Sequence, residues 1–231
     1  MLGKRKNRKR PGAVHHEGEK DPEMLLSRLL EDKPKFHKMH DGTPKSWAVT
    51  PETLKVMFGM LTPGMTTLET GAGHTTVAFA LAGTNHTCIT PAAEEVVRIK
   101  DYLEKLGIGD NVVFINRSSD IALAEKGAIP DELDFVFIDG AHRFPFPAID
   151  WHYTYRKLRI GGIIGIDDIQ IPTVRLLYEF LSVEDEWELV NTTGRTAFFK
   201  KAAQQIRKGD WKSQKTNLIL ESSLTRPIDK P

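Results

Sequence analysis

The chain has 231 residues, of which 40% are hydrophobic and 27% charged, with 32 basic and 31 acidic side chains. These values fit a soluble protein with one sizeable core and exclude a large multidomain assembly. No apolar run reaches the ~18 residues that a membrane-spanning helix needs, and no hydrophobic leader follows the basic start, so we expect a cytoplasmic protein without a membrane span.

The charge is unevenly distributed along the chain. The first ten residues carry six basic side chains and no acid, and residues 200–231 carry eight basic and three acidic ones. Residues 11–199 hold 18 basic against 28 acidic side chains. An acidic body repels polyphosphate, which disfavours a nucleic-acid track across it, although the basic tails could still bind RNA in a salt-dependent way.

The N-terminal part is predicted to contain a tail followed by two helices. Residues 1–20 are too polar to bury a core. Apolar residues at helical spacing predict a helix over 23–30, and Thr50 followed by Pro51 predicts the start of a helix that runs to about Met60. The predicted organisation is a disordered basic tail (1–20), a helical cap (21–60), the main domain (61–201) and a polar basic C-terminal tail (202–231).

From residue 65 onward, short apolar runs alternate with helix-like segments, which is typical of a parallel sheet flanked by helices. Strands are predicted at 65–69, 86–90, 112–115, 134–138 and 161–166, and helices at 75–82, 92–106, 119–126, 147–158 and 172–182. Two further runs, 187–190 and 197–199, predict a terminal antiparallel hairpin. Together these elements predict a doubly wound α/β domain with a mostly parallel, seven-stranded sheet.

A glycine loop follows the first strand of this pattern. It reads Glu69-Thr-Gly71-Ala-Gly73-His-Thr75-Thr76 and lies at the carboxyl end of a strand, where open α/β sheets bind ligands. A dinucleotide-binding loop needs Gly or Ala where Thr76 stands, so hydride transfer is disfavoured. Glu69 would oppose a pyrophosphate but suits a cationic ligand without phosphates. A tight glycine turn that binds no ligand is the alternative.

This loop resembles the first motif of the class I S-adenosylmethionine-dependent methyltransferases, an acidic residue followed by G-x-G. The resemblance covers residues 45–201 and implies a Rossmann-like methyltransferase fold with S-adenosyl-L-methionine as cofactor. By this likeness the loop lies against the methionine part of the cofactor. The residues so implied in cofactor binding are Glu69, Gly71, Gly73 and Thr75.

Two further strand ends correspond to cofactor contacts of that family. The second strand usually ends in an acid that binds both ribose hydroxyls, but here Thr90 stands there and offers one hydrogen bond where a carboxylate accepts two. Glu94 or Glu95 could substitute, or both could lie on a solvated helix face. After the third strand, Ser118 and Ser119 match the adenine contacts, although Ser119 could equally cap the next helix.

Acidic residues gather after the fourth and fifth strands. Asp139-Gly-Ala-His142 follows the fourth, and Asp167-Asp168 follows the fifth. Adjacent parallel strands bring their ends within ~5 Å, so three carboxylates would repel one another unless a cation or a proton joins them. Oxygen ligands favour Mg²⁺, Ca²⁺ or Mn²⁺, and such an ion can lower the pKa of a substrate hydroxyl. The alternative is that the acids cap helices and His142 is structural.

The spacing D-G-x-H followed by a strand ending in D-D is similar to the methyltransferase branch that includes macrocin and rhamnosyl O-methyltransferases. This likeness implies that Asp139, Asp167 and Asp168 bind a divalent metal, with Mg²⁺ as the first choice. It also implies that His142 is the general base, and that Asp139 contributes to catalysis and to the cofactor site. Asp150 falls where the family often has an Asp, although a helix-surface position is the plainer interpretation.

The leading hypothesis is methyl transfer from S-adenosylmethionine to a hydroxyl of a small molecule, such as a sugar or a phenol, assisted by the metal. One alternative is a nucleic-acid methyltransferase, acting on ribose or base and recruited by the basic tails. Another is a non-catalytic cofactor-binding or scaffold domain of the same fold. Assembly into a homo-oligomer is left open.

Overall fold

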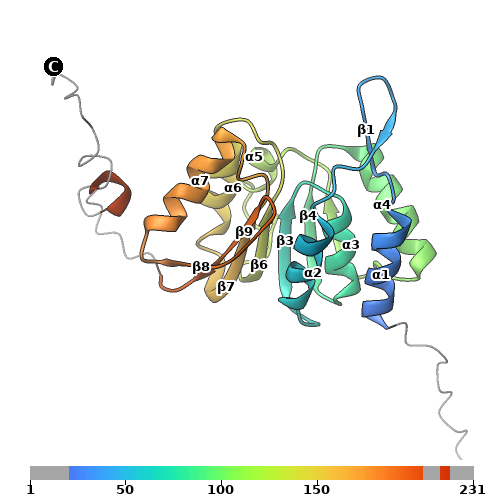
Figure 1. The fold of residues 1–231 in the computed structure, drawn as a ribbon, viewed down its shortest axis with the longest axis horizontal. Helices are drawn as coiled ribbons and strands as arrows, with labels where there is room; N and C mark the ends of the chain where they lie inside the picture. The colour runs from blue at the N-terminus through green and yellow to red at the C-terminus, as the bar shows by residue number, and fades with distance from the viewer. Residues whose placement is uncertain (1–20, 205–213, 219–231) are drawn as a thin grey trace, which may run out of the picture.

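A seven-stranded sheet forms the centre of the molecule, with helices on both of its faces (Figure 1). The computed structural model describes residues 21–204 and 214–218. The strand order is β5-β4-β3-β6-β7-β9-β8, in which the first five pair in parallel and β9 pairs antiparallel with both β7 and β8. The strands are β3 (Thr66–Thr70), β4 (Asn85–Ile89), β5 (Val112–Ile115), β6 (Leu133–Ile138), β7 (Leu158–Ile166), β8 (Trp187–Thr193) and β9 (Thr196–Lys201). The predicted doubly wound α/β fold with a terminal hairpin is confirmed.

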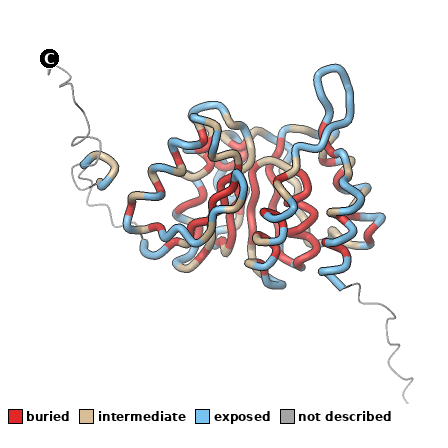
Figure 2. The backbone as a smooth tube through the Cα atoms, in the orientation of Figure 1, coloured by how far each residue is buried: buried red, intermediate tan, exposed pale blue. Residues whose placement is uncertain are grey.

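The helices form two layers, each with its own hydrophobic core against the sheet. One layer comprises α1 (Pro22–Asp32), α2 (Pro51–Gly59), α3 (His74–Leu81) and α4 (Ala93–Leu106), and the other comprises α5 (Ser119–Ala122), α6 (Phe146–Thr154) and α7 (Pro172–Val183). Strand β6 shows how the sheet serves both cores, because side chains alternate between its faces. Phe135 and Phe137 pack with the first layer, and Val136 and Ile138 with the second. Figure 2 shows buried residues along the strands and the inner sides of the helices.

The predicted cap helices are present and share the first core. Thr50 caps α2 as predicted, since its hydroxyl accepts a hydrogen bond of 3.1 Å from the backbone N–H of Thr53. Between α1 and α2 lies a hairpin that was not predicted, formed by β1 (His37–Lys38) and β2 (Pro44–Lys45). Strands of two residues are too short to show an alternating pattern. This hairpin projects beyond the sheet (Figure 1).

Two predicted boundaries are corrected by the structure. Helix α5 ends at Ala122 rather than near residue 126. Helix α6 ends at Thr154, not 158, because Leu158 already belongs to β7, where it pairs with Leu133. Strand β7 therefore begins three residues before the predicted 161. The register of its pairing with β6 shifts between Leu133 and Phe135 of β6.

A short part of the C-terminal tail docks onto the domain. Residues 215–218 form a helical turn, in which the hydroxyl of Thr216 donates a 2.8 Å hydrogen bond to Glu184 and Lys215 pairs with Asp185. The predicted tail over 1–20 and most of that over 202–231 lie outside the described residues. None of the described helices is both long and apolar enough to cross a membrane.

Candidate active site

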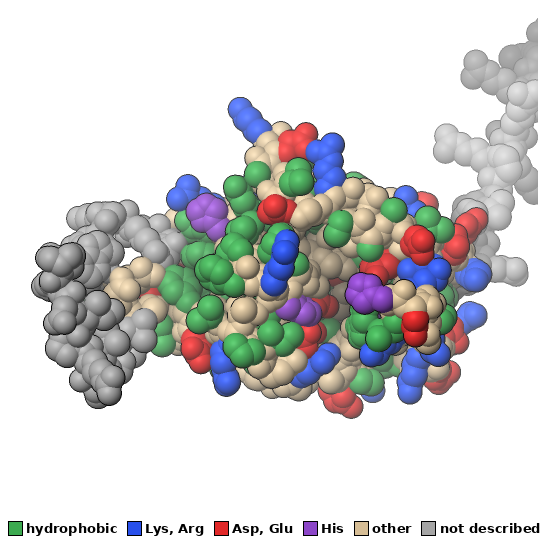
Figure 3. All heavy atoms as spheres, turned by 90° about the horizontal axis from the view of Figure 1, so that it is seen from above, with side chains coloured by type: hydrophobic (Ala, Val, Ile, Leu, Met, Phe, Trp, Pro, Cys, Tyr) green, Lys and Arg blue, Asp and Glu red, His purple; other side chains and the backbone are tan. Residues whose placement is uncertain are grey.

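A cavity of about 770 Å³ opens at the carboxyl ends of the strands. It lies where the winding reverses, because β4 joins β3 on one side of the sheet and β6 joins it on the other. Open α/β sheets bind ligands at such a switch point, and the volume is that of a small-molecule site. Figure 3 looks onto this end of the molecule, where histidine (purple) and acidic (red) side chains lie among apolar ones.

The glycine loop lies where the chain after β3 approaches the chain after β6. Gly71 has φ +91°, and a Cβ built on it would lie 2.1 Å from the carbonyl oxygen of Asp139. Its N–H donates a 2.9 Å hydrogen bond to the carbonyl of Ile89 at the end of β4. Glycine is therefore required at this position both for its backbone conformation and for the close approach.

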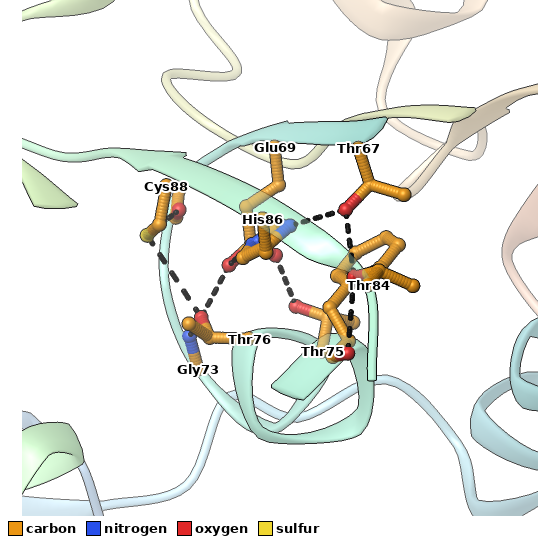
Figure 4. A network of polar contacts seen from close by, with 10 residues as sticks. Thr67, Glu69, Gly73, Thr75, Thr76, Thr84, His86 and Cys88 are labelled. Atoms are coloured by element: carbon orange, nitrogen blue, oxygen red, sulfur yellow. Dashed lines mark hydrogen bonds and ion pairs between the residues drawn. The ribbon is translucent and has the colours of Figure 1, made fainter. Parts of the chain in front are cut away.

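Glu69 holds this loop through its side-chain contacts (Figure 4) and does not line the cavity. It is fully buried, and one carboxylate oxygen accepts a 2.7 Å hydrogen bond from the hydroxyl of Thr75. The other accepts from the hydroxyl of Thr76 and lies 3.2 Å from Nε2 of His86. These contacts give Glu69 a role in shaping the loop, and its part in cofactor binding stays a prediction.

The other residues predicted to bind the cofactor all line the cavity. They are Gly71, Gly73, Thr75, Thr90, Ser118, Ser119 and Asp139. They come from the ends of four neighbouring strands, β5, β4, β3 and β6. The structure thus brings them together, and their contacts with a cofactor stay predictions.

His74 provides a test of whether this cavity suits a polar ligand. It lines the cavity and is 5% exposed, yet neither ring nitrogen has a hydrogen-bond partner among the described residues. Burial, and secondarily the neighbouring His37, lowers its pKa to about 4, so the ring is neutral near pH 7. Buried polar groups are normally satisfied, and a bound ligand with donors and acceptors would satisfy this one.

A cluster of two carboxylates and one imidazole lies at the β6 and β7 side of the cavity. Nε2 of His142 is 3.4 Å from Oδ1 of Asp139 and 3.5 Å from Oδ2 of Asp168. One ligand atom from each residue lies within 4.8 Å of the others, a spacing that a single cation could bridge. Arg195, at the turn between β8 and β9, also contacts Asp168, with Nη1 3.1 Å from Oδ1. The two carboxylates are donors of the kind that suit Mg²⁺ or Mn²⁺.

The electrostatics of the cluster follow from burial and from like charges held together. Burial, with smaller contributions from the carboxylates of Asp167 and Asp168, raises the pKa of Asp139 to about 7 against the opposing effect of His142. The hydrogen bond to Asp139 raises the pKa of His142, which burial partly offsets. Carboxylates that resist ionisation gain from a shared cation.

Asp167 does not belong to this cluster, which corrects the predicted triad of aspartates. It is 2% exposed, does not line the cavity, and its Oδ1 accepts a hydrogen bond from the hydroxyl of Thr196. The next residue, Asp168, has φ +57°, and this turn of the backbone brings its side chain into the cavity. Aspartate tolerates this left-handed conformation better than most residues.

Several cavity residues were missed from the sequence. His37 and Trp47 come from the hairpin region, and Arg195 from the β8–β9 turn. Glu95, which the sequence left open between a substitute for Thr90 and a solvated helix face, lines the cavity. A signal for it was present, because Glu95 stands four residues before Ile99, on the buried stripe of α4.

Asp150 is also corrected, from a helix-surface residue to a fully buried one. Its Oδ2 accepts a 2.7 Å hydrogen bond from the hydroxyl of Thr70, while its Oδ1 has no partner among the described residues. Burial raises the pKa of Asp150 to about 6, and the hydroxyls of Ser119 and Thr70 oppose this effect. Asp150 therefore supports the floor of the cavity from inside the domain.

We expect Asp150→Asn to change how stability depends on pH. The folded protein holds the Asp150 proton up to about pH 6, whereas an unfolded chain releases it near pH 4, so ionisation makes the wild type less stable as pH rises across this window. The variant lacks this loss, and its stability relative to the wild type should rise by about 2 kcal/mol between pH 4 and pH 8. Urea unfolding of both proteins at the two pH values measures it, and an unchanged difference would contradict it.

Part of the chain is similar to a known protein family. Residues 68–169 match the family described as a methyltransferase domain. No curated protein sequence matches the chain.

Solved structures share the fold at low sequence identity. A protein from Corynebacterium glutamicum has 16% identity and a TM-score of 0.62, covering 83% of this chain and 94% of that one. An S-adenosylmethionine-dependent O-methyltransferase from Thermotoga maritima has 16% identity and a TM-score of 0.58, covering 79% and 73%. The O-methyltransferase TomG from Streptomyces achromogenes, involved in tomaymycin synthesis and solved with S-adenosylmethionine, has 17% identity and a TM-score of 0.56, covering 83% and 93%.

Proposed function

We propose that the chain, of which residues 68–169 match a methyltransferase-domain family, transfers a methyl group from S-adenosylmethionine to a hydroxyl of a small molecule with the help of a divalent cation. The single observation that carries this proposal is the cluster of Asp139, His142 and Asp168 on the wall of the cavity that also contains the glycine loop. In this proposal His142 is the proton acceptor and the two aspartates form the cation site. Both lie beside the glycine loop, where the methyl donor would bind.

The strand order supports an arrangement of the two substrates across the sheet. By likeness to the family, adenine would lie at the end of β5, the ribose at β4 and the methionine part at the loop after β3. The next strands, β6 and β7, then carry His142 and the two carboxylates. An acceptor hydroxyl at this end would face the donor's methyl group.

The reaction needs positioning and removal of one proton. Bound S-adenosylmethionine would supply an activated methyl group: the acceptor oxygen would form a bond to the methyl carbon as the C–S bond breaks with its electron pair passing to sulfur, which would release S-adenosylhomocysteine. His142 would accept the hydroxyl proton, and its 35% exposed side chain reaches the cavity. Asp139 and Asp168 would hold the cation, which when bound supplies charge that lowers the pKa of the hydroxyl.

The walls of the cavity favour a small acceptor over a polymer. Trp47 from the hairpin region, 51% exposed, and Phe146 at the start of α6 both line it, and such aromatic surfaces suit rings. Arg195 closes the side near Asp168. These features describe a pocket for a compact molecule with a hydroxyl.

Transfer of a labelled methyl group tests this function. The full chain should move label from S-adenosylmethionine to the oxygen of at least one member of a panel of phenols and sugars in the presence of Mg²⁺. Label that enters only RNA added in parallel would favour the nucleic-acid alternative. A folded chain that binds S-adenosylhomocysteine in calorimetry but labels nothing would point to the non-catalytic alternative.

A further inference from the structure

Glu95 is the acidic residue of α4 that faces the cavity. It aligns with the buried Ile99 and Leu103 at four-residue spacing, which places it on the inner stripe of the helix. Its side chain is 18% exposed, whereas that of the preceding residue, Glu94, is 75% exposed and contacts Lys38. Two adjacent glutamates therefore have opposite environments, and Glu95 alone of the two lines the cavity.

A histidine of the hairpin fixes where the Glu95 carboxylate lies. Nδ1 of His37 is 3.1 Å from Oε1 of Glu95, and both side chains are largely buried. The other ring nitrogen, Nε2, faces the glycine loop, since a Cβ built on Gly73 would lie 3.4 Å from it. The carboxylate thus lines the cavity from α4, with the His37 ring between it and Gly73 of the glycine loop.

Thr90 leaves a need for acceptors at this same position. It directly follows β4 and lines the cavity, but its hydroxyl oxygen already accepts a 3.3 Å hydrogen bond from the backbone N–H of Ala92. Two vicinal hydroxyls of a ribose present two donors, and the Thr90 hydroxyl, with one of its two lone pairs used by Ala92, cannot accept both. A carboxylate accepts about four hydrogen bonds, so Glu95 retains acceptor capacity beside His37.

We propose that Glu95 binds the two ribose hydroxyls of the cofactor, five residues later in the chain than the position at which this fold usually carries an acid. This inference rests on the cofactor binding assumed in the proposed function. It goes beyond that function, because it assigns ribose recognition to the first turn of α4 and to the hairpin that contacts it.

Calorimetry with S-adenosylhomocysteine tests the assignment without any acceptor. We expect Glu95→Gln to weaken binding by about 10- to 100-fold, the effect of losing charge-assisted hydrogen bonds. The matched control is Glu94→Gln, which removes the same charge one residue away and should bind within about twofold of the wild type. Thermal unfolding of both variants verifies that they fold.

A second ligand separates ribose recognition from general damage to the site. Toward the analogue of S-adenosylhomocysteine that lacks both ribose hydroxyls, the wild type and Glu95→Gln should bind equally, because the partner of Glu95 is gone. Equal loss with both ligands, or unchanged binding of S-adenosylhomocysteine by the variant, would overturn the assignment. A wild-type chain that binds neither ligand would instead overturn the cofactor premise and the proposed function together.

Discussion

Replacing His142 with alanine is expected to lower the turnover number by about 10²–10⁴-fold, the range typical for loss of a general base. The imidazole lies between Asp139 and Asp168 on the cavity wall, and in the proposed mechanism it accepts the proton of the acceptor hydroxyl. The dissociation constant of S-adenosylhomocysteine should stay within about twofold, because by this arrangement the donor lies on the β3 side. Initial rates of methyl transfer and calorimetry on the same protein sample measure the two quantities.

His152→Ala is the matched control for this variant. His152 is on α6, ten residues further along the chain, where it is exposed and does not line the cavity. It should transfer methyl groups at the wild-type rate. An unchanged rate in His142→Ala would remove the base from the mechanism, and a large loss of cofactor affinity would reassign the residue to binding.

The fold could be predicted because strands and helices each leave their own hydrophobic pattern in the sequence. The apolar runs before Glu69 and Asp139 predicted buried parallel strands, and both are present. The hairpin around His37 could not be predicted, because its strands pair only two residues each and carry no apolar alternation. The predicted end of α6 near Leu158 was wrong for a different reason. The sequence from Tyr155 to Leu158 is compatible with a helix, and only the pairing of Leu158 with β6 shows that it belongs to β7.

Site residues that directly follow a strand could be predicted from the sequence. Where the local backbone conformation decides which side chain enters the cavity, they could not. Asp139 and His142 were placed in the cavity by topology alone. For the consecutive Asp167 and Asp168, the sequence could not tell which carboxylate enters, because this depends on the positive φ of the second. Arg195 is distant along the chain and meets Asp168 only because β9 pairs with β7.

Asp168→Asn is expected to weaken Mn²⁺ binding by at least about tenfold and to abolish the part of the turnover that a chelator removes. First-sphere ligands should matter at least as much as outer-sphere partners, whose loss typically costs 10–100-fold in affinity. Asparagine keeps the size of the side chain and also tolerates φ +57°, so the backbone at this turn should be preserved. Electron paramagnetic resonance of free Mn²⁺ measures the affinity of the full chain.

The neighbouring Asp167→Asn is the sharpest control, because it removes the same charge one residue earlier. Asp167 is buried against Thr196, and the Oδ1 of an asparagine can still accept that hydroxyl's hydrogen bond. Its Mn²⁺ affinity should therefore remain within about threefold of the wild type, whereas a triad of all three aspartates would require both variants to lose the ion. If both variants bound Mn²⁺ as tightly as the wild type and turnover were complete in chelator, the enzyme would be metal-independent. Asp139 and Asp168 would then serve only to hold His142.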